Sequence, residues 1–405
     1  MLVLAAMPAA VAAVGGSDGA LGAVLGVQAF SVALFFVVGG VVGDRFNRRT
    51  VAVCADLLCC LSQLATAGVL LLGGATLWQL LVTQVIQGAG LALSLTSLNG
   101  LIPEAVAKPR LQEANALLAV ARAAGAFLGP VVAGMVFAIG LGVGWAFVAD
   151  ALTFAISAQC LRAISQRRVG AERSQSALSD LRAGWIEFWS QSWIWAVVVE
   201  FALLNATVIA PFFVIGPALT EQSLGGPGGW PLILAAMGLG EIFGGLVAKT
   251  WHPARPLLAA VLAVLAWGIP LALMILLAPA AIVGLGVVIG GAGLIVFDAL
   301  WRTALQSRVS PGFRSRVASF DFLGSRVFVS VGFALSGAAA ASIGPQLILV
   351  GSLIILLAAT CVVASLRSVR ALTADAPTQG APDSTAARPL KDPPLGLELV
   401  HGAET

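Results

Sequence analysis

The segment Gly39-Gly40-Val41-Val42-Gly43-Asp44-Arg45-Phe46-Asn47-Arg48-Arg49 decides how this chain is organised. It ends one long apolar stretch with a cluster of charges. A degraded copy, Gly244-Gly245-Leu246-Val247-Ala248-Lys249, ends another apolar stretch 205 positions later. A charged connection between apolar segments, repeated at half the chain length, is typical of a membrane protein built from two similar halves.

Composition places the chain in a membrane. Hydrophobic residues make up 59% of the 405 residues, charged residues make up only 10%, and the mean hydropathy is +0.99. Soluble domains carry about 25% charged residues, and about 20 consecutive apolar residues cross a hydrocarbon layer of ~30 Å. Several segments reach that length, which excludes a large soluble core and predicts an all-α integral membrane protein.

The apolar segments predict twelve membrane spans. They fall at about 1 to 14, 19 to 43, 51 to 72, 77 to 99, 115 to 139, 146 to 164, 194 to 217, 231 to 249, 256 to 277, 280 to 301, 317 to 342 and 346 to 366. The chain thereby divides into an N-terminal six-span half (1–164), a central linker (165–193), a C-terminal six-span half (194–370) and a tail (371–405).

Charge distribution predicts the orientation. Lys and Arg residues gather in alternate connections, beginning with Arg45, Arg48 and Arg49, while the connections between them carry none. Because positively charged loops stay cytoplasmic, both termini are expected in the cytoplasm and the short Gly-rich loops outside. A bacterial inner membrane is the expected location.

The linker and the tail have compositions of their own. In residues 165 to 193 the apolar side chains recur at helical spacing, which predicts either an amphipathic helix on the inner leaflet or the leading end of the seventh span. These side chains are Leu178, Leu181, Trp185, Phe188 and Trp189. The tail is rich in Pro, Ala and small polar residues, a composition typical of disorder.

Further matches at nearly the same offset support an internal repeat. Val85-Ile86-Gln87-Gly88-Ala89-Gly90-Leu91 matches Val288-Ile289-Gly290-Gly291-Ala292-Gly293-Leu294 at offset 203, and Arg110 and Arg122 match Arg314 and Arg326 at offset 204. Spans 2, 4 and 5 therefore pair with spans 8, 10 and 11. Since six spans separate the copies, both halves enter the membrane in the same sense, as parallel repeats.

The repeat also exposes a short first span. Its 14 residues would reach only about 21 Å as a helix, less than the ~30 Å of hydrocarbon. Carrying the offset back from the seventh span puts the expected start about ten residues before Met1. We therefore expect the first span to be truncated and the start at Met1 to be internal.

At this point the residues resemble the major facilitator superfamily. Its signature loop between spans 2 and 3, G-x-x-x-D-R/K-x-G-R-R/K, is matched except where Asn47 replaces a glycine, a replacement that tolerates the left-handed conformation. The matching residues are Gly40, Asp44, Arg45, Arg48 and Arg49. The resemblance implies a twelve-span transporter fold in which this loop helps to close the cytoplasmic side.

The fifth span carries a second resemblance. Gly125-Ala126-Phe127-Leu128-Gly129-Pro130-Val131-Val132-Ala133-Gly134 is similar to the motif G-x-x-x-G-P-x-x-G-G of exporters that exchange substrate for protons, with Ala133 in place of one glycine. The matching residues are Gly125, Gly129, Pro130 and Gly134. Residues 103 to 147 resemble the enterobactin-exporter and macrolide-efflux branch in particular, which implies efflux of a small compound.

Charged residues at membrane depth are functional candidates because their burial is costly. Arg122 and Arg326 occupy equivalent places in spans 5 and 11, where they serve either as gate parts paired with carboxylates or as snorkelling anchors. Asp44 is expected to pair with a cation when the cytoplasmic side closes. Plain topological charge explains Arg45, Arg48 and Arg49 equally well but leaves Asp44 unexplained.

Acidic residues within spans are the candidates for proton coupling or substrate binding. Glu241 leads, because it lies about ten residues into span 8, near the midplane, where a carboxylate can exchange protons during transport. Asp298, Asp321 and Arg326 are expected to form a cluster on the cytoplasmic side, or to be paired structural charges. The weaker candidates are Glu200, Asp298, Asp321, Asp56 and Asp150.

The sequence gives no support for an enzyme, a metal site or a nucleotide-binding site. The five cysteines lie in apolar segments without metal-type spacing, and the two histidines, His252 and His401, form no cluster. No phosphate-binding loop is present, so neither a cofactor nor ATP is expected and an ion gradient would supply the energy.

Together these features predict a secondary transporter, not an enzyme, that exports a small amphipathic or hydrophobic compound by alternating access with protons as the coupling ion. A siderophore exporter of the same fold is the first alternative and would need cationic or polar groups in the cavity. A non-transporting membrane scaffold or sensor is the second, supported only by the short first span.

Overall fold

A computed structural model describes the chain except for residues 107–109, 165–188, 225–228, 310–313 and 373–405. Every regular element in this part of the chain is helical. The predicted linker helix and the tail fall almost entirely on residues outside it.

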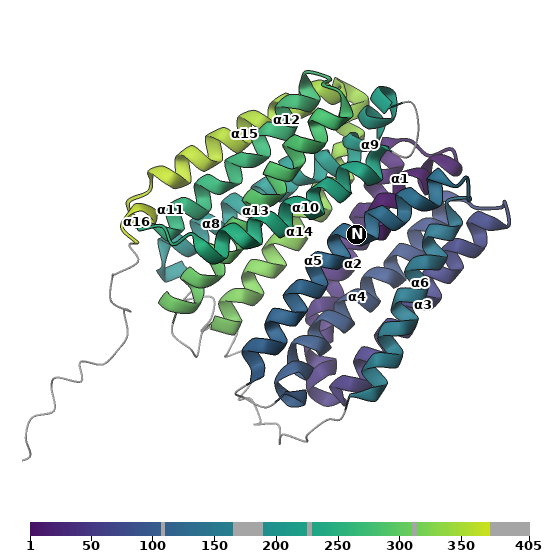
Figure 1. The fold of residues 1–405 in the computed structure, drawn as a ribbon, viewed down its shortest axis with the longest axis horizontal. Coiled ribbons are helices and arrows are strands. Elements are labelled where there is room, and N and C mark those ends of the chain that lie inside the picture. Colours follow the sequence, from purple (N-terminus) through teal and green to yellow (C-terminus); the bar gives the residue numbers. More distant parts are fainter. Residues whose placement is uncertain (107–109, 165–188, 225–228, 310–313, 373–405) are drawn as a thin grey trace, which may run out of the picture.

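The described residues of the first half form six α-helices, which correspond one to one with the six predicted segments. They are α1 (Leu2–Ala13), α2 (Asp18–Arg45), α3 (Arg48–Leu71), α4 (Leu77–Ala105), α5 (Leu111–Ala138) and α6 (Gly144–Ala163). Figure 1 shows this half, coloured purple to blue, packed as one bundle beside the other half.

The second half repeats the layout with two interrupted spans. One span is α8 (Ser192–Leu204), the π-helical turn η2 (Asn205–Ile209) and α9 (Ala210–Leu224), and another is α11 (Pro256–Ala263), η3 (Val264–Trp267) and α12 (Gly268–Ile275). The uninterrupted helices are α10 (Gly229–Thr250), α13 (Ala280–Arg308), α14 (Arg314–Ile343) and α15 (Pro345–Ser365), followed by the short α16 (Arg367–Arg370).

Helix length and composition agree with a membrane protein. Ten helical segments of the described chain are long and apolar enough to cross a bilayer, and two shorter apolar helices, Leu2–Ala13 and Val327–Ile343, accompany them. Together they occupy the positions of the twelve predicted segments. The short α1 agrees with the short first segment seen in the sequence.

Local sequence signals set the helix ends. Asn47 caps α3, its side-chain oxygen accepting a hydrogen bond from the Thr50 backbone amide at 3.1 Å. Its φ is −63°, so Asn47 replaces the signature glycine as a helix cap and not, as expected from the sequence, by adopting the left-handed conformation. Gly73 and Gly140, in the Gly-rich loops, do adopt positive φ after α3 and α5.

The internal repeat is visible in helix packing. Gly88 of α4 packs against the backbone of α2, and its match Gly291 of α13 packs against the backbone of α10. Two residues further on, Gly90 packs against α3 and its match Gly293 against α11. The matched glycines therefore make matched contacts, because each lets two helices approach more closely than a side chain would allow.

Candidate functional site

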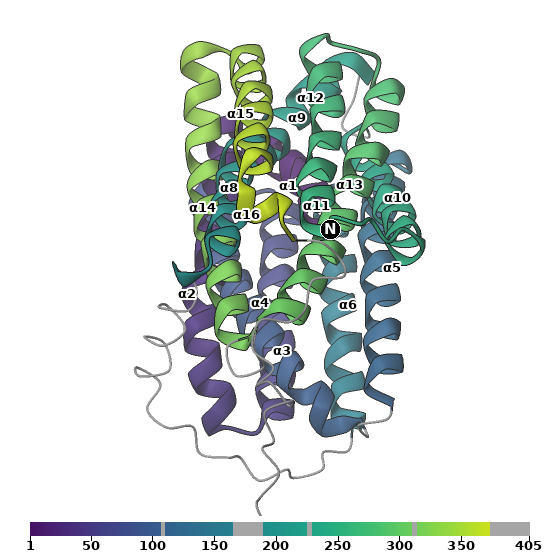
Figure 2. The same cartoon turned by 90° about the vertical axis from the view of Figure 1, so that its left-hand side faces the viewer.

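The two halves meet mainly in two helix crossings, with smaller contacts of α1 with α10 and of α2 with α9. Figure 2 shows α2 with α14 on one side of the molecule and α5 with α10 on the other. These are helices of spans 2 and 11, and of spans 5 and 8. Any movement of one half against the other must change these two contacts, so they frame the candidate site.

The first crossing, between α2 and α14, depends on glycine. A Cβ added at Gly22 would overlap the carbonyl oxygen of Phe333, and one at Gly26 would lie 3.1 Å from the carbonyl oxygen of Ser330. Further along α2, Phe36 stacks on Phe322 with ring centroids 4.1 Å apart. The contact thus continues well along both helices.

The second crossing, between α5 and α10, includes the exporter-like motif. A Cβ added at Gly238 of α10 would lie 2.7 Å from the Cα of Phe127, and one at Gly134 would lie 3.5 Å from Pro231. Gly129 of the same motif packs on the backbone of α1, next to Leu2. The motif therefore lies where the halves touch.

This second contact ends early. Toward the Leu111 end of α5, Leu117 and Val120 are exposed, and on α10 a Cβ at Gly245 would meet nothing within 4 Å. Figure 1 shows the two helices diverging in this direction. The halves are thus closely packed at the end that contains Gly134 and separate along this side toward the opposite end.

Glu241 lies beside the second crossing. It follows Gly238 by three residues on α10, so the two are neighbours on the helix surface, and its side chain is half-buried. In the other half, Asp150 of α6 accepts a hydrogen bond from Nε2 of Gln63 at 2.7 Å. The α1 helix packs against both α6 and α10, the helices that carry Asp150 and Glu241. Each half therefore places an acidic residue on a helix that adjoins α1.

Glu200 has a different setting. Its side chain on α8 is 3% exposed, and neither carboxyl oxygen has a hydrogen-bond partner among the described residues. The α15 helix packs against this part of α8. Glu200 therefore lies within the second half and not at either crossing between the halves.

Asp56 lies in the core of the first half. Ser94 of α4 donates a hydrogen bond to its Oδ1 at 2.8 Å, and Ser157 of α6 donates one to its Oδ2 at 2.5 Å. The side chain is 2% exposed. Asp56 thus joins three helices of one half, an arrangement that satisfies a buried carboxyl group without a cation.

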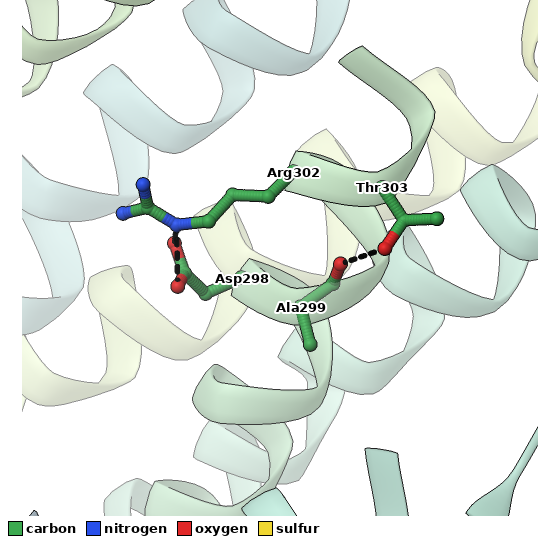
Figure 3. Close-up of polar contacts among 4 residues, drawn as sticks. All are labelled: Asp298, Ala299, Arg302 and Thr303. Carbon is green, nitrogen blue, oxygen red and sulfur yellow. Dashed lines mark hydrogen bonds and ion pairs between the residues drawn. The ribbon is translucent and has the colours of Figure 1, made fainter. Parts of the chain in front are cut away.

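Asp298 forms an ion pair within its own helix. Figure 3 shows the Nε of Arg302 donating to both carboxyl oxygens of Asp298, at 2.9 and 2.8 Å, one turn away on α13. Both side chains are largely exposed. The predicted partners of Asp298, the side chains of Asp321 and Arg326, lie outside the part of the chain that the structure describes.

The charged turn between α2 and α3 reaches two neighbouring helices. The guanidinium group of Arg48 occupies the space beside Gly100 of α4, where a Cβ would overlap it. The side chain of Arg49 donates a hydrogen bond to the backbone carbonyl of Arg162, in the last turn of α6. A cation at the carboxyl end of a helix is favourable because carbonyl groups gather there.

Four predicted gate residues, including Arg326 with its side chain outside the described residues, have no partner in the part of the chain that the structure describes. Arg45 and Arg122 are exposed, and the Asp44 side chain lies outside the described residues. The described structure therefore brings Arg48 and Arg49 onto α4 and α6, but it does not test the pairing predicted for Asp44, Arg122 or Arg326.

Sequence reasoning missed a group of buried amides in the first half. Gln63 and Gln84 are fully buried and Gln87 nearly so, and each has at least one side-chain atom without a partner in the described structure. Ser62 donates to the carbonyl of Thr83 at 2.6 Å, which places Gln63 and Gln84 at one level. The seven-residue spacing from Asp56 to Gln63 was the available signal, because such residues share one helix face.

A bundle of apolar helices in two repeated halves, joined by two helix crossings with acidic groups at the junction, defines a membrane transporter. Comparison with known families agrees. Residues 1–327 match the family model of the Major Facilitator Superfamily. The chain belongs to this family, as the sequence motifs predicted.

One curated relative comes from the branch indicated by the motifs. The chain is 27% identical over 222 residues to the enterobactin exporter EntS of Shigella boydii serotype 18. The match covers 54% of this chain and 52% of the relative, so the chain spans about half the length of the relative it matches.

Solved transporters share the fold. The nucleoside transporter NupG aligns with a TM-score of 0.69 at 14% identity, covering 90% of this chain and 95% of that one. A bacterial homologue of the human lysosomal transporter Spinster, in an inward-facing and occupied conformation, aligns with a TM-score of 0.65 at 15% identity, covering 91% and 95%. At these identities the likeness establishes the fold alone.

Proposed function

We propose that this transporter exports a small amphipathic or hydrophobic compound across a bacterial inner membrane in exchange for protons. The observation that carries the proposal is the position of the half-buried Glu241 on α10, one turn from Gly238, where α10 packs on α5 of the other half. Carboxyl groups in such a place can bind a proton or a cationic group of the substrate in one state and release it in the other. The exporter-like motif in α5 and the exporter among the relatives support the direction.

The proposed orientation places both termini in the cytoplasm. Under the positive-inside rule the α2–α3 turn faces the cytoplasm, and the end where Gly22 and Gly134 are packed faces outward. The described arrangement then corresponds to a state closed on the outside. In this proposal Asp44, Arg122 and Arg326 join the charged turn in closing the cytoplasmic side later in the cycle.

Vesicles with a pH gradient test the proposal. Purified protein would be reconstituted, and proton flux recorded while a panel of amphipathic compounds is added one at a time. We expect at least one compound to elicit proton movement, and we expect Glu241→Gln to abolish it, because an amide cannot take up the proton. The control is Glu113→Gln, which changes an exposed carboxylate at the start of α5.

Two outcomes would refute parts of this proposal. Unchanged pH dependence of transport in Glu241→Gln would remove Glu241 from the coupling. No substrate-dependent proton flux with any compound would instead favour a non-transporting scaffold.

A siderophore exporter is the second candidate function, favoured by the named activity of the enterobactin exporter. The acidic groups described at the junction favour a neutral or cationic substrate over an anionic one. Transport of enterobactin by the same vesicles, with no response to amphipathic amines, would decide for the siderophore exporter.

A further inference from the structure

Glu200 is a carboxyl group in a place that does not suit a charge. It is 3% exposed, and both of its oxygens lack a hydrogen-bond partner among the described residues. Burial of an ionised carboxylate without compensation is far more costly than burial of the neutral acid. Asp56 shows the contrast within the same chain, because two serines donate to its oxygens.

The facing helix supplies one polar group. Thr360 of α15 is fully buried, and its hydroxyl oxygen likewise has no partner in the described structure. This hydroxyl lies near the Glu200 carboxyl group, but the two groups form no hydrogen bond in the described structure. A threonine hydroxyl can accept a hydrogen bond from a protonated acid, so a small shift would pair the two groups.

Charged groups on the neighbouring helices have other positions or partners. The Arg370 side chain of α16 donates to the carbonyl of Ala364, and Asp298 of α13 is paired with Arg302. The α15 helix carries one titratable residue, Cys361, which is exposed. The charged side chains of α14 lie outside the described residues; they are Arg314, Arg316, Asp321 and Arg326.

Glu200 is linked to the junction of the halves by continuous contacts. The π-helical turn η2 begins five residues after it, and such turns are frequent at functional sites. Gly332 of α14 packs directly on the backbone of this turn at Ala206. The next residue, Phe333, presents its carbonyl to Gly22 of α2 in the other half. A shift of α8 would therefore be transmitted to the α2–α14 crossing through the adjacent residues Gly332 and Phe333 of α14.

We propose that Glu200 is a proton-binding site of this transporter, separate from the acidic groups at the junction, with the Thr360 hydroxyl as the acceptor for the bound proton. The carboxylate takes up one proton from a hydronium ion: an O–H bond of the hydronium breaks to leave water, and the O–H bond of the acid forms. Loss of the proton leaves a charge between α8 and α15, which favours a rearrangement of the span that contains η2. This last step rests on the proposed function; the binding of the proton does not.

Infrared difference spectroscopy tests the site directly. Spectra of the purified protein would be compared from about pH 5 to about pH 9, a range that covers displaced carboxyl groups. We expect the C=O band of a protonated, buried acid that is present in the unchanged protein and absent in Glu200→Gln. Thr360→Val should keep this band but move it to higher frequency, because the acid loses its acceptor. The control Asp56→Asn should retain the band.

Three results would overturn the proposal. The first is an identical carboxylic-acid band in Glu200→Gln and the unchanged protein. The second is an unmoved band in Thr360→Val, which carries the test if Glu200→Gln fails to fold. The third is rescue of an unstable Arg326→Gln variant by Glu200→Gln, which would show an ion pair instead.

The outcomes separate this site from the proposed function. A Glu200 band without any substrate-dependent proton flux would leave the site in place and refute the proton-coupled export. Substrate-dependent proton flux without a Glu200 band would refute the Glu200 site and leave the proton-coupled export in place.

Discussion

Replacement of Gly22 by alanine tests whether the α2–α14 crossing closes one end of the transporter. The added Cβ would overlap the carbonyl oxygen of Phe333, a backbone atom that moves only with its helix. Overpacking a close contact costs about 1–3 kcal/mol. This cost falls only on states in which the helices touch, so the population in which they are apart should rise roughly 5- to 150-fold.

Cysteine accessibility measures this shift. Leu21 is 3% exposed, so a cysteine placed there, with the five native cysteines replaced, should react slowly with a polar maleimide. We expect faster labelling when Gly22→Ala is added. The matched control is Gly40→Ala on the same helix, where a Cβ meets nothing within 4 Å. Equal labelling rates in the two variants would refute the assignment of this crossing as a seal.

Two further predictions concern charged residues away from the crossing. Arg49→Gln removes a charged donor to the carbonyl of Arg162. Because this bond is exposed to solvent, the loss should lower stability by only about 0.5–1 kcal/mol, seen as a lower thermal unfolding midpoint, whereas the exposed Arg45→Gln should change it little. Asp298→Asn breaks an exposed ion pair with Arg302 and should change stability by less than about 1 kcal/mol, with substrate-dependent proton flux retained; loss of that flux would return Asp298 to the coupling residues.

The sequence predicted the architecture because glycine spacing reports helix contacts directly. Gly88 and Gly291, matched by a fixed offset, make equivalent close contacts in the two halves. Positions where only glycine fits are thus readable without a structure. The same holds for Gly129 in α5, where a Cβ would lie 2.8 Å from the backbone nitrogen of Leu2, whereas a Cβ at Gly134 would make only an ordinary contact with Pro231 of α10.

The side-chain environments of the carboxyl groups could not be predicted in the same way. Asp56 and Glu200 are both acidic residues within apolar segments, yet two serines donate hydrogen bonds to Asp56, whereas Glu200 has no hydrogen-bond partner among the described residues. The difference depends on which residues of other helices face each carboxyl group. One of the two donors to Asp56 is Ser157, which lies 101 positions away in the sequence. The spacing of residues in a sequence shows which of them share one face of a helix, but it does not show which other helix packs against that face.

The two crossings differ in length, and the difference bears on how a substrate arrives. Among the described residues, the glycine and ring contacts between α2 and α14 extend from Asp18 to Phe36 along α2, about 27 Å of helix, whereas the glycine contacts between α5 and α10 extend from Phe127 to Gly134 along α5, about 10 Å. If the transported compound is hydrophobic, as proposed, the side on which α5 and α10 diverge is the one from which it would arrive out of the bilayer. Its concentration in the membrane, and not in the surrounding water, would then set the rate of uptake.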